Sequence, residues 1–82
     1  MTIVGTYVLA KDVTTSGTIF SCRLIFKVLD EPEPNVIVRY TENGLDFSHL
    51  MNGADERDRR TLEQGRGIWR IHVEHGYRRV EE

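Results

Sequence analysis

The sequence predicts a mainly β fold, α+β at most, in which a single domain covers residues 1–82 as an antiparallel meander of about six short strands. The strongest observation is the run from Thr18 to Leu29, where apolar residues occupy every second position from Phe20 to Val28. A period of two indicates a strand with one buried face. So many short strands in a short chain favour a small barrel or a strongly bent sheet, because both arrangements limit exposed strand edges.

Turn signals divide the first half of the chain into strands. Pro32 and Pro34 predict a loop over residues 30–35, since proline fixes φ and donates no backbone hydrogen bond. Asn43-Gly44 predicts a two-residue hairpin turn, because both positions tolerate positive φ. The remaining segments are predicted as strands over 2–10, 36–41 and 45–49, with a polar loop over 11–17 that ends in Ser-Gly.

The last third of the chain predicts one short helix and a closing hairpin. The helix is expected near residues 54–64, where the apolar stripe is thin. Gly65-Arg66-Gly67 ends it, and residues 68–74 then alternate as a strand. His75-Gly76 is the expected turn to a returning strand over 77–81.

Residues on the apolar faces of these strands form the predicted core. Each is expected to be largely buried, because its side chain points away from the polar face of its strand. The predicted core residues are Phe20, Leu24, Phe26, Val38, Trp69, Ile71 and Val73.

Cysteine content and hydropathy predict a cytoplasmic protein. Cys22 is the single cysteine, so the chain forms no internal disulfide. The first residues lack the charged segment and long apolar run of a signal peptide. The longest mainly apolar stretch, Leu24 to Leu29, is too short to cross a bilayer, and no membrane partner is expected.

The sequence contains no motif that catalysis or cofactor binding requires. It lacks a nucleophile elbow, a glycine-rich phosphate loop and a metal-binding helix, so we expect neither an enzyme nor a cofactor. His72 and His75 would point to opposite faces of the predicted strand. Cys22 lies on an apolar strand face, where a thiol acts as a small hydrophobic group. No metal site is therefore expected.

Charge distribution indicates one candidate binding surface. The formal net charge is −2, yet seven arginines lie between Arg57 and Val80 against three acidic residues. Arginine binds carboxylates and phosphates bidentately, so these residues could bind a partner. The ordinary alternative is a solvated face with local pairing between residues four apart on a helix. The partner-binding candidates are Arg59, Arg60, Arg66, Arg70, Arg78, Arg79 and Tyr77.

These observations favour a small non-enzymatic protein-binding module that acts as an accessory, regulatory or inhibitory protein, as a monomer or homodimer. Inhibitors encoded by phages and mobile elements, anti-CRISPR proteins among them, are similarly small and similarly lack recognisable motifs. The alternative is an RNA- or DNA-binding module that uses the arginine-rich face, with Tyr77 or Trp69 as a stacking platform. A structural subunit that assembles through strand edges is a third possibility.

Overall fold

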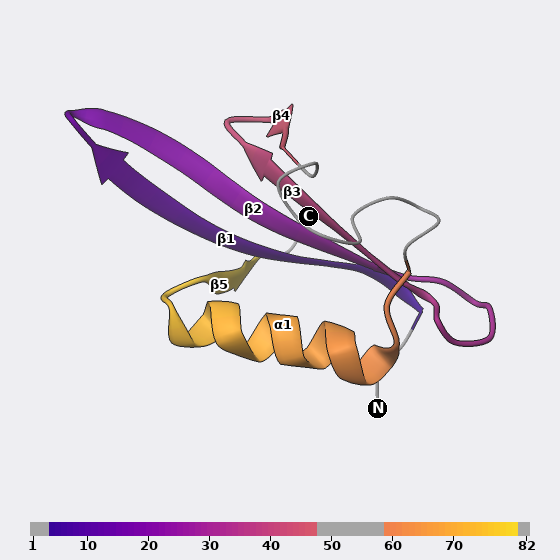
Figure 1. Ribbon diagram of the computed structural model, residues 1–82. Coiled ribbons are helices and arrows are strands. Elements are labelled where there is room, and N and C mark those ends of the chain that lie inside the picture. The colour runs from indigo at the N-terminus through magenta and orange to yellow at the C-terminus, as the bar shows by residue number, and fades with distance from the viewer. Residues whose placement is uncertain (1–3, 48–58, 81–82) are drawn as a thin grey trace.

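The computed structural model describes residues 4–47 and 59–80, and these form one antiparallel sheet with one α-helix across it (Figure 1). The five strands follow the order β4-β3-β2-β1-β5, so the sheet is open. A closed barrel was one of the two predicted arrangements, and the sheet does not form it. A mainly β fold with a small helical part is confirmed. The elements are β1 (Gly5–Thr15), β2 (Thr18–Val28), β3 (Val36–Glu42), β4 (Leu45–Asp46), α1 (Leu62–Glu74) and β5 (Arg78–Val80).

Alternating residues of the three long strands build the core. The register aligns Leu9 with Leu24 and Leu24 with Tyr40, so side chains from β1, β2 and β3 stack on one face of the sheet. Leu9, Leu24 and Val38 are fully buried there. The period of two between Thr18 and Val28 therefore predicted both the strand and its buried face correctly.

Two-residue turns connect the hairpins. Asn43 and Gly44 have φ values of 51° and 82°, as predicted for the turn between β3 and β4. Ser16 and Gly17 have φ values of 52° and 79° and form the same kind of turn between β1 and β2. The loop predicted over residues 11–17 is therefore wrong in extent. A turn of positive φ at both central positions matches the twist of the flanking strands, so β1 continues as far as Thr15.

The closing hairpin predicted over residues 68–81 is wrong, because residues 62–74 form α1. A capping box begins the helix: the Thr61 hydroxyl accepts from the Gln64 backbone N–H, and the Gln64 side chain accepts from the Thr61 backbone N–H. The helix predicted near 54–64 is displaced toward the C-terminus. Its residues 54–58 lie outside the described part of the chain, and Arg60 forms a β-bridge with Val36.

The helix lies across the face of the sheet that carries the core (Figure 1). Trp69 packs edge-on against Phe26, with 5.2 Å between the ring centroids. Gly65 lies close to Val36, since a Cβ atom added to this glycine would be 3.2 Å from Val36 Cγ1. These contacts take the place of the pairing that was predicted between residues 68–74 and a returning strand. β5 pairs with β1 instead.

The position of the helix also changes which of the predicted core residues are buried. Leu24, Phe26 and Val38 are buried as predicted. Ile71 and Val73 are exposed at 54% and 46%, because the outer side of α1 carries them. The remaining two predicted core residues, Phe20 and Trp69, are half-buried.

Candidate functional site

The described arginines do not share one element. Arg59 lies just before α1 and forms an ion pair with Glu31, which lies in the loop between β2 and β3. Arg60 exchanges backbone hydrogen bonds with Val36, at N···O distances of 2.8 and 2.9 Å. Arg66 and Arg70 are exposed one turn apart on α1. Together, these four arginines extend from the segment just before α1 to the middle of the helix.

The other three candidates lie between α1 and β5 and on β5 itself. Arg78 and Arg79 are adjacent strand residues, so their side chains point to opposite faces of the sheet. Arg79 lies on the helix side, where its guanidinium carbon is 5.8 Å from the Tyr7 ring centroid. Tyr77 contacts His72 edge-on at 5.1 Å, and Lys11 Nζ lies 5.9 Å from the Tyr77 ring centroid. The structure thus places Arg78 on the opposite face of the sheet from Arg79. Partner binding by these residues stays a prediction.

A polar cluster lies near the C-terminal end of the helix, between β2, β3 and Tyr77. The Tyr40 hydroxyl donates to Glu42 Oε1 at 2.7 Å. Burial raises the pKa of Tyr40 far above its ordinary value, and hydrogen bonds to Cys22 and Glu42 raise it further. Burial is also the main reason that the pKa of Tyr77 is raised. Both phenols therefore stay protonated at neutral pH, and the Tyr40 phenol is a hydrogen-bond donor.

Across residues 4–47 and 59–80, no three histidine, cysteine, aspartate or glutamate side chains come together in a way that could hold a metal ion. No helix within those ranges is long and apolar enough to cross a membrane.

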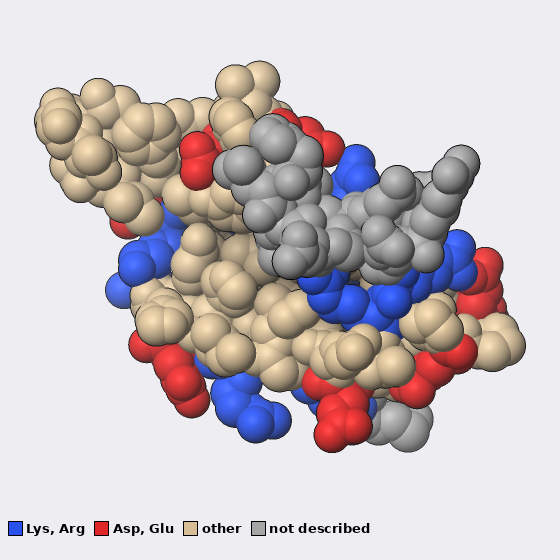
Figure 2. All heavy atoms as spheres, viewed as in Figure 1, with Lys and Arg blue, Asp and Glu red and all other residues tan. Residues whose placement is uncertain are grey.

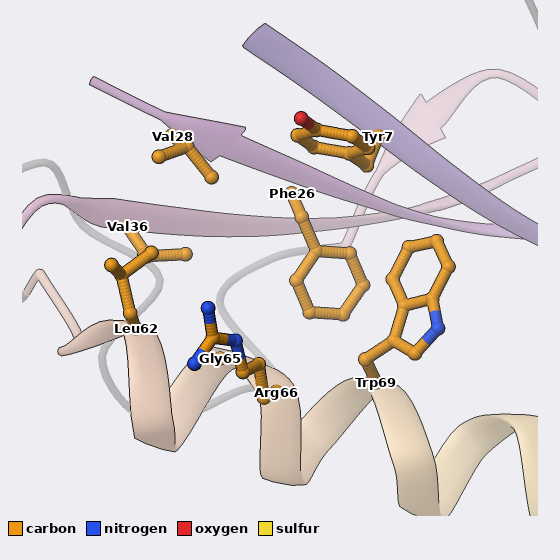
Figure 3. Close-up of a pocket in the computed structure, with 8 residues that line it drawn as sticks. All are labelled: Tyr7, Phe26, Val28, Val36, Leu62, Gly65, Arg66 and Trp69. Atoms are coloured by element: carbon orange, nitrogen blue, oxygen red, sulfur yellow. The ribbon is translucent and has the colours of Figure 1, made fainter. Parts of the chain in front are cut away.

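A cavity of about 240 Å³ lies between the N-terminal half of α1 and the sheet (Figure 3). The sheet and the helix each contribute half of the described lining. Its walls are mainly aromatic and aliphatic, and one arginine side chain extends from the helix toward the sheet. The lining residues are Tyr7, Phe26, Val28, Val36, Leu62, Gly65, Arg66 and Trp69.

The ends of β1 and β2 form a projecting two-stranded segment, Val13–Phe20, which we call the arm. β5 pairs only with Val8–Ala10 of β1, and β3 pairs only with Cys22–Val28 of β2. Among the residues that the structure describes, the two strands of the arm therefore pair only with each other. Every arm residue except the half-buried Phe20 is exposed, and none carries a charge, as the tan end of the molecule in Figure 2 shows.

Sequence reasoning missed both the arm and the cavity. The signal for the arm was present, because residues 13–22 carry no charge and are rich in β-branched types. The expected loop over 11–17 hid it. The cavity had no such signal, since its walls come from segments far apart in the sequence that meet only in the folded chain.

Comparison of the chain with protein-family models, with curated proteins and with solved structures finds no match.

Proposed function

We propose that this chain is a small non-enzymatic protein-binding module, an accessory, regulatory or inhibitory protein that binds its partner through the arm. The observation that carries the proposal is the pair of strand edges on an uncharged, exposed hairpin that no other described strand covers. Natural sheets protect exposed edges with charged residues, prolines or very short strands. β4 and β5, the terminal strands of the sheet, are two and three residues long, whereas the arm has none of these protections.

Strand edges of this kind support binding because their row of backbone N–H and C=O groups is a template for pairing with another chain. In the arm, the backbone groups that point away from the hairpin have no strand partner among the described residues. An extended segment of another protein can pair with such an edge, and side chains next to it give specificity. Ile19, which is 64% exposed, and Val13, which is 36% exposed, supply apolar contact area beside the edges.

The composition of the arm favours a protein partner over a nucleic acid. Binding to nucleic acid draws its affinity largely from lysine and arginine contacts with phosphates. The arm has neither residue. The helix α1 carries Glu63 and Glu74 as well as its two arginines, and Figure 2 shows blue and red side chains interspersed over the face in view. Binding through the arm should therefore depend little on salt.

The test compares two isoleucines of similar exposure. Ile19 lies in the arm, and Ile71, which is 54% exposed, lies on α1. We expect Ile19→Lys to lower capture of the partner from a cell lysate about tenfold or more, because a charge beside a free edge opposes strand addition. Ile71→Lys should capture the partner as the parent does. Quantitative mass spectrometry of the captured proteins measures the difference, and circular dichroism checks that both variants fold.

Two outcomes would contradict the proposal. Equal capture by Ile19→Lys and the parent would mean that the partner binds elsewhere. Capture of nucleic acid that weakens linearly with the logarithm of salt concentration would favour the arginine-rich face instead. Substitution of Arg66 and Arg79 by glutamate would then remove the binding.

A further inference from the structure

The cavity under α1 has the size and the walls of a site for a small apolar molecule. An apolar cavity of about 150 Å³ can hold benzene. At about 240 Å³, this cavity has room for about ten non-hydrogen atoms. An ordered water molecule needs about two to four polar partners, so walls that are mainly aromatic and aliphatic favour an apolar occupant.

The two ends of the cavity differ in chemistry (Figure 3). Aromatic rings gather at one end, those of Tyr7, Phe26 and Trp69. Aliphatic side chains gather at the other end, those of Val28, Val36 and Leu62. A ligand that matches both ends therefore has an aromatic part and a short aliphatic part.

The aromatic end is arranged to pack against a further ring. Phe26 and Trp69 already meet edge-on, with 5.2 Å between their centroids and 66° between their planes. Rings prefer edge-on or offset contacts, so a third ring can join this pair without a change in its geometry. Trp69 and Leu62 are half-buried, which leaves both ends of the cavity within reach of solvent.

The charge of the lining favours a neutral ligand. Arg66 is the charged residue among the eight that line the cavity, and it is exposed and already takes part in another interaction of the chain. The lining residues that the structure describes include no acidic side chain. A charged ligand would therefore lose hydration against apolar walls without a free opposite charge to compensate it.

We propose that the cavity binds a small neutral alkyl-substituted aromatic molecule, with its ring beside Phe26 and Trp69 and its alkyl group beside Val28 and Leu62. This is a second binding site, separate from the arm, and the proposal does not depend on the proposed function. The ligand is defined by three properties: a single ring, a short alkyl group and no charge.

The chain provides its own probe for the test. Trp69 is the only tryptophan and lines the cavity, so its fluorescence reports occupancy. We would titrate the protein with ethylbenzene and, separately, with benzoate and benzylammonium, which are of similar size and carry opposite charges. Ethylbenzene should give a saturable change with a Kd of about 1 mM or lower. Both ions should bind about tenfold more weakly or worse, because each must give up its hydration.

A matched pair of phenylalanine substitutions assigns the binding to the cavity. Val28 is 6% exposed and lines the aliphatic end, so Val28→Phe should fill the space and abolish the saturable change. Ile71 is 54% exposed and does not line the cavity, so Ile71→Phe should bind ethylbenzene within about twofold of the parent. Circular dichroism checks that both variants fold.

Amide shifts of the unmodified protein locate the ligand without any substitution. Ethylbenzene should shift the backbone amides of Gly65 and Trp69 and leave that of Thr15 unchanged, because Thr15 lies in the arm. This measurement decides the outcome if Val28→Phe does not fold.

Several results would overturn the proposal. One is the absence of a saturable change up to the solubility limit of ethylbenzene. Others are equal or tighter binding of either ion, undiminished binding by a folded Val28→Phe variant, or amide shifts confined to residues outside the cavity. Because the arm is not altered in either variant, these failures would leave the proposed protein binding unaffected.

Discussion

Gly65 shows how one residue sets the position of the helix. It is buried, and the space that a side chain would need is occupied by Val36 at 3.2 Å. A glycine inside a helix costs about 0.8–1 kcal/mol relative to alanine. That cost is accepted here because the missing side chain allows α1 to approach β3 closely. Gly65-Arg66-Gly67 suggested the end of a helix, whereas Gly65 is a contact within one.

Tyr40 gives a prediction at alkaline pH. The raised pKa of its phenol means that the unfolded chain releases the proton near 10.0 while the folded chain retains it. Stability from this group is complete below pH 10 and is lost as the pH rises from there toward the folded-state pKa. We expect the free energy of unfolding to fall above pH 10, by less than about 1.4 kcal/mol per pH unit from this half-buried phenol.

The variant Tyr40→Phe isolates the effect. It should lose about 0.5–1.5 kcal/mol at pH 7, because the hydrogen bond to Glu42 is removed. Its decline above pH 10 should be shallower than that of the parent, and Tyr77 should account for part of what remains. Urea unfolding between pH 7 and 11 measures the loss of stability at pH 7 and the decline above pH 10. Parallel declines in the two proteins would show that Tyr40 carries no such linkage.

At the scale of elements, most of the first half of the chain was predictable, apart from the extension of β1 to Thr15, and the second half was not. Period-two patterns predicted the strands β1, β2 and β3. The turn at Asn43-Gly44 was predictable because both residues tolerate positive φ. The stretch from Ile68 to Val73 alternates in the same way, but there the pattern misled. β-branched residues also occupy a helix when tertiary packing favours it. The overlooked signal was the capping box of Thr61 and Gln64.

Two isoleucines of α1 test the helix against the predicted strand. In the helix, Ile68 packs against the core while Ile71 is exposed. Ile71→Glu should therefore change the free energy of unfolding by less than about 0.5 kcal/mol. Ile68→Glu should cost about 2 kcal/mol or more, because it places a charge against apolar groups. A strand would give the reverse order, since Ile71 would then face the core. Urea unfolding of the two variants measures the order.

At the scale of the whole molecule, one small core carries most of the stability. A chain this short buries a modest share of its surface, so each fully buried side chain matters. Leu24, 1% exposed, is at the centre of the sheet, and Leu24→Ala should cost about 2–5 kcal/mol. Ile19→Ala in the arm should stay within about 0.5 kcal/mol of the parent. Thermal unfolding distinguishes them, and similar losses would mean that the arm is packed against other parts of the chain.

The helix is joined to the sheet at both of its ends, and this governs how fast the molecule can rearrange. At the first end, Arg60 bridges to Val36. At the second, Lys11 Nζ donates to the His75 carbonyl oxygen at 2.6 Å, and β5 pairs with β1 soon after. Hinge motions of whole elements take microseconds to milliseconds, and here such a motion would have to break contacts at both ends of α1. The space beneath α1 should instead open through rotamer changes of Leu62 and Arg66, which occur in picoseconds to nanoseconds for exposed side chains.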